Sequence, residues 1–259
     1  IDIFLTKWEA LIERVSNSQG EFKVVVVGGG AGGVELALST QHRLQNMLRE
    51  QGDDPQRLSY TLLTQSDRIM HMHNGGVRDR FERIFSERDI SIKVRSRVAE
   101  VKADQVLLDD GTVFSTDAII WVTTASAPAW PAEAGLSVDE NGFIRVDKNL
   151  QSLSHEGIFA AGDIASLKDP RPKSGVFAVR QGPVLVHNLK AAATHKRLRP
   201  YRPQKNFLGL ISTGDKYAIA SRGNFSFESA WLWKVKDWID VQFMRKFNEL
   251  PDMDEQDNP

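Results

Sequence analysis

A run of glycines near the start of the chain has the spacing of a dinucleotide-binding turn. Residues 28–33 read Gly-Gly-Gly-Ala-Gly-Gly, which puts Gly28, Gly30 and Gly33 at the three key positions. In such a turn the first glycine allows the bend, the second lets the backbone approach a pyrophosphate, and the third lets the helix pack closely on the strand. The run therefore predicts NAD(P) binding, and we include Ala31 and Gly32 among the cofactor-binding residues.

The elements on either side of the glycines decide whether this turn can hold an anion. Phe22 to Val27 is a nearly continuous apolar run, which is typical of a strand buried on both faces of a parallel sheet. Val34 to Gln51 has a helical pattern. A pyrophosphate would bind the free N–H groups at the start of that helix, where the helix dipole favours negative charge. This setting favours a cofactor site over a purely structural turn.

The second predicted strand, Leu58 to Thr64, ends without the usual acidic residue. Thr64 stands where a carboxylate would hold the ribose 2′-hydroxyl. The absence of a carboxylate leaves room for a 2′-phosphate on the ribose, and Arg68 would then bind that phosphate. Arg68 as the cap of a solvated turn is the alternative, so the sequence leaves both NADH and NADPH open.

The rest of the chain alternates between helices and strands. Asp109-Asp110-Gly111 supplies a tight hairpin turn within a segment of short alternating strands. The order of elements predicts an α/β unit with a small β insertion. Helices are expected at 2–15, 77–88, 176–193 and 229–247, short antiparallel strands at 92–95, 97–101 and 106–108, a buried strand at 117–122, further strands at 207–212 and 217–221, and a basic, proline-punctuated linker at 195–203.

Composition excludes several kinds of function. The chain has 259 residues, a net charge of −1 and 41% hydrophobic residues, which is ordinary for a soluble globular protein. The balanced charge argues against nucleic acid as a partner, and no apolar run approaches the roughly 18 residues of a spanning helix. The absence of cysteine excludes disulfides, thiolate metal sites and cysteine-based redox chemistry. Because His71 and His73 alone do not make a metal site, none is predicted.

Three motifs, in order, resemble those of the pyridine nucleotide-disulfide oxidoreductase superfamily. They are the glycine run extended over 28–37, Asp-Ala-Ile-Ile-Trp-Val-Thr at 117–123, and Gly-Ile-Phe-Ala-Ala-Gly-Asp at 157–163. The resemblance implies an α/β fold in which a Rossmann-like NAD(P)-binding domain is inserted into an FAD-binding domain. It also implies FAD and NAD(P)H as cofactors.

The resemblance implies a flavin site in the second half of the chain. Asp163 would hydrogen-bond the ribityl chain of FAD, and Gly162 would allow the close approach. Residues 178–181 resemble the segment of type II NADH dehydrogenases that puts a glutamine beside flavin and quinone, which assigns Ala178 to the cofactor and Gln181 to the reaction. The alternative for Gln181 is a surface position.

Two further features carry implied roles. Glu35 would lie close to the nicotinamide, and the alternative is a glutamate in the first helical turn that favours the helix dipole. The helix beginning near Gly175 would point its N-terminus at the flavin, where the positive helix end stabilises the negative charge of the reduced ring. The chain departs from the family at Thr124, where relatives usually have glycine.

The resemblance divides the chain into five segments. No glycine motif of the FAD type precedes Lys23, so the chain resembles the central and C-terminal parts of the family. It is therefore either a piece of a longer protein or a chain that no longer binds FAD. The segments are a linking helix at 1–19, an NAD(P)H-binding Rossmann domain with a β-meander at 20–125, the C-terminal part of the FAD-binding domain at 126–195, a small α+β region at 196–250, and an acidic linker or tail at 251–259.

The function expected from these features is that of an FAD-dependent NAD(P)H oxidoreductase. Hydride would pass from nicotinamide to flavin, and electrons would leave to a quinone, a carrier protein, oxygen or a selenium species. The alternative is a non-catalytic NAD(P)-binding module with a regulatory or interaction role.

The last helix, 229–247, interleaves aromatic and basic residues. Such a helix can dock on a membrane interface, and it is also typical of a core or a subunit contact, including a homodimer. A narrower resemblance, carried by 180–183 and 231–238, is to the flavoprotein module fused ahead of selenide, water dikinase, which would make 251–259 a linker to a covalently attached domain. We expect a cytoplasmic protein, peripheral on the inner face of the membrane if the helix docks there.

Overall fold

The structure is a computed structural model, and it describes residues 2–204 and 207–248. The described residues form two compact units. The large unit comprises 2–123 and 208–248, and the small unit comprises 124–204 and 207. Along the chain, the small unit is thus an insertion between two parts of the large one. The predicted acidic tail at 251–259 lies outside the described residues.

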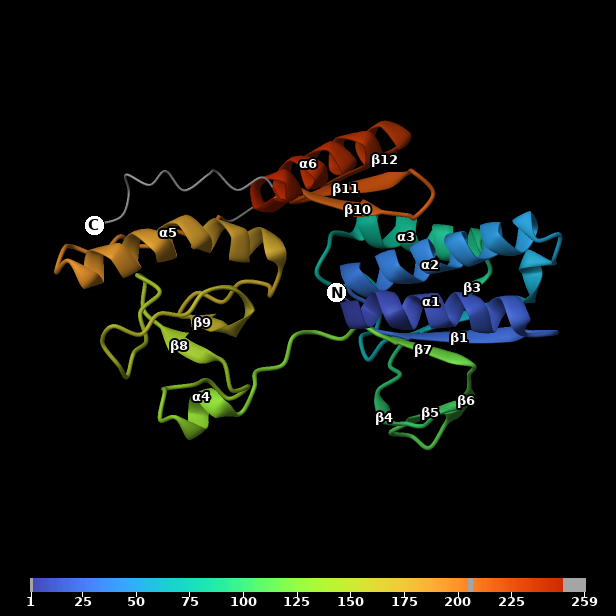
Figure 1. The fold of residues 1–259 in the computed structure, drawn as a ribbon, viewed down its shortest axis with the longest axis horizontal. Helices are drawn as coiled ribbons and strands as arrows, with labels where there is room; N and C mark the ends of the chain where they lie inside the picture. Colours follow the sequence, from blue (N-terminus) through green and yellow to red (C-terminus); the bar gives the residue numbers. More distant parts are fainter. Residues whose placement is uncertain (1, 205–206, 249–259) are drawn as a thin grey trace. The chain divides into compact units, whose positions relative to one another are not determined.

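A four-stranded parallel sheet forms the centre of the large unit (Figure 1). β1 (Phe22–Val27) pairs on one side with β2 (Leu58–Leu63) and on the other with β7 (Ala118–Trp121). β3 (Ile90–Lys93) pairs with the outer side of β2 and completes the order β3-β2-β1-β7. A parallel sheet with helical crossovers is the Rossmann-like α/β arrangement that the sequence predicted.

Three helices cover one face of this sheet, and a small antiparallel sheet packs against the other (Figure 1). The valines of β1 alternate between the two faces: Val24 and Val26 pack with the helices, and Val25 and Val27 pack with the small sheet. Burial on both faces is the reason why β1 reads as a continuous apolar run. The helices are α1 (Asp2–Asn17), α2 (Ala31–Glu50) and α3 (Gly75–Glu87), the small sheet consists of β4 (Val98–Val101), β5 (Gln105–Leu108) and β6 (Val113–Ser115), and a short 3-10 helix, η1 (Pro55–Arg57), precedes β2.

The position of β3 corrects one expectation. The sequence predicted 92–95 as the first of the short antiparallel strands, and this was wrong, because Ile90–Lys93 runs parallel to β2 with Ile90 opposite Tyr60. An edge strand exposes one face, so its residues alternate between buried and exposed as they would in a hairpin. The alternation alone therefore could not distinguish the two arrangements.

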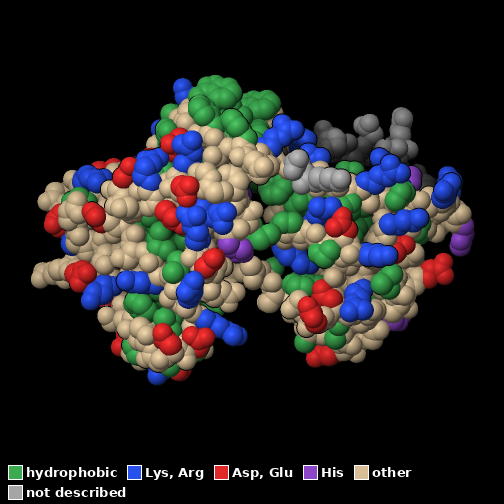
Figure 2. Space-filling model, turned by 180° about the vertical axis from the view of Figure 1, so that it is seen from behind, with side chains coloured by type: hydrophobic (Ala, Val, Ile, Leu, Met, Phe, Trp, Pro, Cys, Tyr) green, Lys and Arg blue, Asp and Glu red, His purple; other side chains and the backbone are tan. Residues whose placement is uncertain are grey.

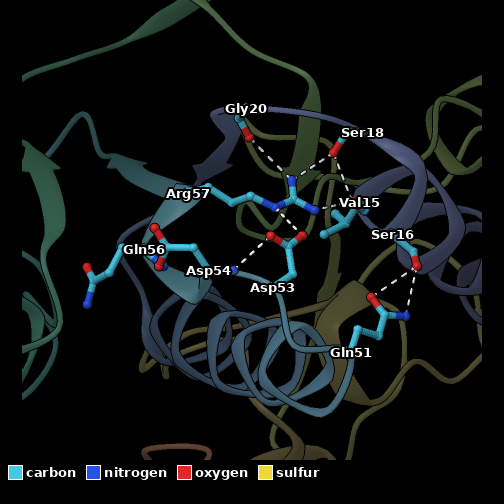
Figure 3. A network of polar contacts seen from close by, with 9 residues as sticks. All are labelled: Val15, Ser16, Ser18, Gly20, Gln51, Asp53, Asp54, Gln56 and Arg57. Carbon is cyan, nitrogen blue, oxygen red and sulfur yellow. Dashed lines mark hydrogen bonds and ion pairs between the residues drawn. The ribbon is translucent and has the colours of Figure 1, made fainter.

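A single arginine ties the end of α1 to the loops that lead into β1 and β2 (Figure 3). Arg57, whose side chain is 9% exposed, donates from Nη2 to the carbonyl oxygen of Val15 at 2.7 Å. Its Nη1 donates to Ser18 Oγ at 2.9 Å and to Gly20 O at 3.3 Å, and its Nε donates to Asp53 Oδ2 at 2.8 Å. This cluster, the Arg57 clamp, fixes α1 against the central sheet.

After the small unit, the chain returns to the large unit as three antiparallel strands and a long helix. They are β10 (Gly209–Ser212), β11 (Ala218–Arg222), β12 (Phe225–Ser229) and α6 (Ala230–Asn248). β12 was not predicted from the sequence, because this strand runs into α6 without a break. No described helix is long and apolar enough to cross a membrane.

These C-terminal strands pack against the helices that flank the central sheet. β10 contacts α2, and β12 contacts α3. Glu228 on β12 accepts from Arg80 at 2.6 Å and from Arg83 at 2.8 Å, and both arginines lie on α3. The C-terminal region is therefore part of the large unit and not a separate domain.

The small unit contains one long helix packed over two short parallel strands. Its core joins β8 (Ile144–Val146) and β9 (Ala165–Leu167) to α5 (Gly175–Ala193), with Leu150 fully buried among them. A short helix, α4 (Trp130–Glu133), precedes the strands, and a 3-10 turn, η2 (Gly162–Ile164), leads into β9.

The basic segment 195–203 is packed onto the small unit, so its prediction as a linker was wrong. Asn188, fully buried on α5, donates from Nδ2 to Arg199 O at 2.9 Å and accepts from Arg199 N on Oδ1 at 2.7 Å. Two residues later, Tyr201 N donates to Lys148 O at 2.8 Å, and the Tyr201 ring joins the core. The charged and proline residues concealed these anchors, since each partner is distant in sequence.

Candidate functional site

The glycine turn has no room for side chains at two of its positions. Gly28 follows β1 with φ +130°, and a Cβ there would lie 1.9 Å from the carbonyl oxygen of Val122 on the neighbouring strand segment. A Cβ on Gly33 would lie 1.9 Å from Gly28 O. Only glycine permits backbones to approach so closely. These two contacts correspond to the tight bend and the close helix packing that the spacing of the glycines requires.

Gly30 faces open space instead. A Cβ at this position would meet nothing within 4 Å. Gly30 is the N-cap of α2, and no side chain caps the helix there. The first N–H groups of a helix have no partners within it, so those of Ala31 and Gly32 are available to a ligand. Open space beside unpaired amides at the positive end of a helix dipole fits a pyrophosphate.

The two residues predicted around the ribose lie in different surroundings. Thr64 is buried against the turn, where a Cβ on Gly29 would lie 2.6 Å from its Oγ1. Arg68 donates from Nε and Nη2 to Glu82 at 2.8 and 2.6 Å, and from Nη2 to Asp79 at 2.6 Å. The guanidinium of Arg68 thus neutralises two carboxylates of α3, and a 2′-phosphate would compete with them.

Glu35 joins α2 to the C-terminal strands and helix. Its Oε1 accepts from Ser212 N on β10 at 2.7 Å and lies 3.8 Å from the Lys236 ammonium on α6. Burial raises the pKa of Glu35, and the Ser212 hydrogen bond and the Lys236 charge oppose that rise. The side chain is therefore not a solvated first-turn glutamate. Sequence reasoning missed Ser212 and Lys236, because nothing near Glu35 in the chain points to partners so far away.

The flavin residues predicted from the third motif surround a cavity of about 330 Å³ within the small unit. Gly162 has φ +71°, and a Cβ there would lie 3.5 Å from the Cβ of Ala178. Its N–H donates to Gln181 Oε1 at 2.5 Å, and Gln181 is only 3% exposed. Gln181 is therefore not a surface residue. Asp163 is exposed at the cavity, where its carboxylate accepts no hydrogen bond from the described residues.

The start of α5 borders the same cavity. Ser174 is the N-cap of α5, yet its Oγ is buried and has no hydrogen-bond partner among the described residues. Lys173 donates from Nζ to Ala165 O at 2.8 Å and lies 3.8 Å from the centre of the Phe143 ring. Burial lowers the pKa of Lys173, and Asp139 and Asp163 oppose this shift. An unpartnered hydroxyl, a helix N-terminus and a free carboxylate at one cavity fit part of a flavin cofactor, which is polar and becomes negatively charged on reduction.

The structure thus brings the predicted residues together in two groups, one in each unit. The glycine turn and Thr64 form the group in the large unit, and Arg68 and Glu35 point to other partners. Gly162, Asp163, Ala178 and Gln181 form the group in the small unit. Within the described part of the chain, no three His, Cys, Asp or Glu side chains are placed to hold a metal ion.

Comparison with known proteins identifies the family. The model of the pyridine nucleotide-disulphide oxidoreductase family matches residues 8–182, which is more than half of the chain. The chain therefore belongs to this family, as its motifs predicted. FAD and NAD(P)H are the cofactors of the family.

Curated relatives are distant in sequence. Ferroptosis suppressor protein 1 of Taeniopygia guttata is 26% identical over 209 residues, which cover 76% of this chain and 52% of that protein. Alternative NAD(P)H-ubiquinone oxidoreductase C1 of Arabidopsis thaliana is 25% identical, over 83% of this chain and 44% of that protein. The type II NADH:quinone oxidoreductase of Haemophilus influenzae is 22% identical, over 80% of this chain and 46% of that protein. The chain spans about half the length of the curated relatives it matches.

Solved structures agree on the fold. The sulfide:quinone oxidoreductase of Aquifex aeolicus matches with a TM-score of 0.72 at 17% identity, over 92% of this chain and 60% of that one. The ferredoxin reductase of Rhodopseudomonas palustris matches with a TM-score of 0.58 at 21% identity, over 82% of this chain and 49% of that one. These similarities confirm the predicted fold class.

Proposed function

We propose that the protein is an FAD-dependent NAD(P)H oxidoreductase that passes electrons to a separate acceptor. The observation that carries this proposal is the glycine turn, in which Gly28 and Gly33 are packed too tightly for side chains while Gly30 faces open space. A turn with a merely structural role would not need open space at its central glycine. Family membership and the cavity of the small unit support the flavin part of the proposal.

Each predicted residue has a task in this proposal. Gly28, Gly30 and Gly33, with the amides of Ala31 and Gly32, hold the pyrophosphate of the nicotinamide nucleotide. When bound, FAD supplies the ring that accepts hydride from nicotinamide. The residues proposed for FAD are Asp163, Gly162 and Ala178 for binding, and Gln181 beside the ring.

Gln181 and Glu35 have the most specific proposed roles. Gln181 holds the Gly162 amide and so fixes the backbone beside Asp163, the residue proposed to bind the ribityl chain. Glu35 lies just beyond the first turn of the helix that begins at the pyrophosphate site, which supports a place near the nicotinamide. Because its carboxylate contacts β10, Glu35 would couple the C-terminal strands to that site.

Thr64 and Arg68 are proposed to face the ribose of the nicotinamide nucleotide. The ion pairs of Arg68 with Asp79 and Glu82 weigh against recruitment by a 2′-phosphate. The neutral side chain of Thr64 repels neither nucleotide. Comparing NADH with NADPH in one assay decides between them.

For the acceptor, we propose a quinone first. The Arabidopsis and Haemophilus relatives are named as oxidoreductases of ubiquinone and quinone, respectively. A carrier protein is the second candidate, since putidaredoxin reductase in complex with putidaredoxin shares the fold. A selenium species, which a covalently linked dikinase domain would use, is the third candidate.

A quinone acceptor agrees with a peripheral membrane contact through α6. Figure 2 shows hydrophobic side chains gathered where α6 lies, at the top of the molecule. Trp231 and Trp238 are 66% and 64% exposed, and Leu232 is the buried residue of the described part of this helix. We propose a location at the cytoplasmic face of a membrane.

The test is a visible spectrum of the purified protein, followed by anaerobic addition of NADH and, separately, NADPH. We expect a flavin absorption band that bleaches with at least one of the two nucleotides. A protein that stays colourless with added FAD, yet binds NADH in calorimetry, would be a nucleotide-binding module and not an oxidoreductase.

A further inference from the structure

Three arginines line a second pocket of the small unit, of about 500 Å³. Arg180 comes from α5, and Arg199 and Arg202 come from the basic segment that packs beside it. Among the described residues, none gives these three guanidinium groups a hydrogen bond or an ion pair. None of the described residues that line the pocket is acidic. The pocket is therefore a concentration of positive charge without a counterion among the described residues.

The fold holds these arginines in place. Asn188, fully buried, binds the backbone of Arg199 through both its donor and its acceptor, at 2.9 and 2.7 Å. Tyr201, between Arg199 and Arg202, is anchored by its N–H on Lys148 O at 2.8 Å. Two separate anchors, Asn188 on α5 and Lys148 after β8, thus fix the backbone of the segment that carries Arg199 and Arg202.

Two buried polar atoms of the same pocket are incompletely satisfied. The Tyr201 residue is 8% exposed, and its hydroxyl faces Gln181 but makes no well-formed hydrogen bond within the described chain. The amide Nε2 of Gln204 is likewise buried and unpaired among those residues. A buried polar group without a partner destabilises the folded protein, so such groups usually meet a ligand or water.

From this arrangement we infer that the pocket binds a small molecule bearing phosphate groups, held by Arg180, Arg199, Arg202 and the Tyr201 hydroxyl. All these groups are donors, and together they offer a multiply charged cationic surface carried on anchored backbone. Guanidinium groups match the oxygen geometry of phosphate and bind it through paired hydrogen bonds. A ligand with a single charge or with few oxygens would leave most of these donors unsatisfied.

The inferred site is independent of the proposed oxidoreductase activity. Gln181 faces the Tyr201 hydroxyl, and its side chain also lines the cavity assigned to flavin. An anion at the arginine pocket would thus lie one side chain away from that cavity. Binding of the anion nevertheless requires neither FAD nor nicotinamide, so the two proposals can fail separately.

The test is calorimetric titration with inorganic pyrophosphate at low ionic strength, using the wild-type protein and single variants. We expect R199Q and R202Q each to weaken binding roughly tenfold or more, because each loses a charged donor to the ligand, and Y201F to weaken it less, because it loses a neutral one. The matched control is R145Q, since Arg145 is an exposed arginine of the same unit outside the pocket. Y201F guards against misfolding, because it keeps the ring in the core and removes only the hydroxyl.

Two outcomes overturn the inference. If R199Q, R202Q and Y201F bind pyrophosphate as tightly as R145Q does, the pocket is not the binding site. The second arm follows only the pyrophosphate binding that R199Q and R202Q weaken, because the glycine turn is itself proposed to bind a pyrophosphate, and it repeats the titration with saturating FAD and then with saturating NADH. Loss of pyrophosphate binding in either case would assign the arginines to the phosphates of a cofactor, whereas unchanged binding supports a site for a separate phosphorylated molecule.

Discussion

Gly30 differs from its neighbours in what surrounds it, and that difference makes a sharp test of nucleotide binding. An alanine at this position meets no protein atom within 4 Å, and its backbone is extended, so the fold can accept it. The added methyl group would, however, occupy the space assigned to the pyrophosphate. We predict that G30A binds NADH at least about tenfold more weakly while its unfolding free energy changes by no more than about 1 kcal/mol.

The control for this variant is G75A. Gly75 also begins a helix and faces open space, but it lies on α3, away from the glycine turn. Fluorescence titration with NADH and urea unfolding measure the two effects. Equal NADH affinity for G30A and G75A would show that the turn does not bind the pyrophosphate.

The burial of Glu35 leads us to expect that the stability of the protein depends on pH. Burial raises its pKa in the folded protein above the ordinary value of 4.5, so folding favours the protonated form. The contribution of Glu35 to stability is then complete below pH 4.5 and is lost as the pH rises through the folded-state pKa. We predict that E35Q, which remains neutral and can still accept from Ser212, loses less stability than the wild type over this rise in pH.

Urea unfolding at several pH values between about 4 and 8 measures this difference. E9Q is the matched control, because it makes the same change at Glu9, which is exposed on α1. A profile for E35Q that matches that of the wild type would mean that ionised Glu35 is fully compensated by Ser212 and Lys236.

At the scale of elements, the Arg57 clamp holds the end of α1 and the loop that follows it. R57A would remove a donor from the carbonyls of Val15 and Gly20 and from the carboxylate of Asp53, and among the described residues Val15 O would keep only its hydrogen bonds from Ser18. We predict a loss of about 2–3 kcal/mol in the free energy of unfolding, measured with urea. R43A, at an exposed position on α2, should change it by less than about 0.5 kcal/mol. Equal effects of the two substitutions would show that the clamp adds no stability.

Elements defined by local pattern could be predicted from the sequence. The apolar run and the glycines after it predict β1 and α2. The Asp-Asp-Gly turn predicts the hairpin formed by β5 and β6. The parallel pairing of β3 and the separate strand β12 could not be read in this way. An edge strand and a hairpin strand alternate alike, and β12 has no break before α6.

The side-chain partners at the candidate site could not be predicted where they are distant in the sequence. The glycine turn was recognisable because its geometry is encoded in adjacent residues. Glu35 and Ser212 are 177 positions apart, and Arg68 meets Asp79 and Glu82 only because α3 folds back. Likewise, nothing in the string of basic residues at 195–203 indicates that Asn188 would hold them against α5.

For the whole molecule, the exposed aromatic residues of α6 predict membrane binding. W231S and W238S together remove two large exposed side chains and disturb little of the core. We expect the double variant to bind vesicles of phosphatidylcholine and phosphatidylglycerol several-fold more weakly than the wild type in co-sedimentation. W130S is the control, since Trp130 is 57% exposed but lies on α4 of the small unit.

Light scattering of the same variants separates the two explanations for the aromatic surface. If vesicle binding is unchanged and the wild type is a dimer that W231S/W238S converts to a monomer, α6 is a subunit contact. If neither property changes, these tryptophans serve neither purpose.

The insertion of the small unit has a consequence for how the protein forms during synthesis. The ribosome releases domains from the N-terminus onward, and N-terminal parts generally fold first. All four strands of the central sheet emerge before residue 123, but β10, which supplies the Ser212 amide to Glu35, emerges only after the entire small unit. A nascent chain stalled before residue 208 would therefore carry a complete parallel sheet with α2 and α3 still uncovered on the side that β10 and β12 later occupy. This intermediate exposes surface that the complete chain buries, and chaperones bind such surface.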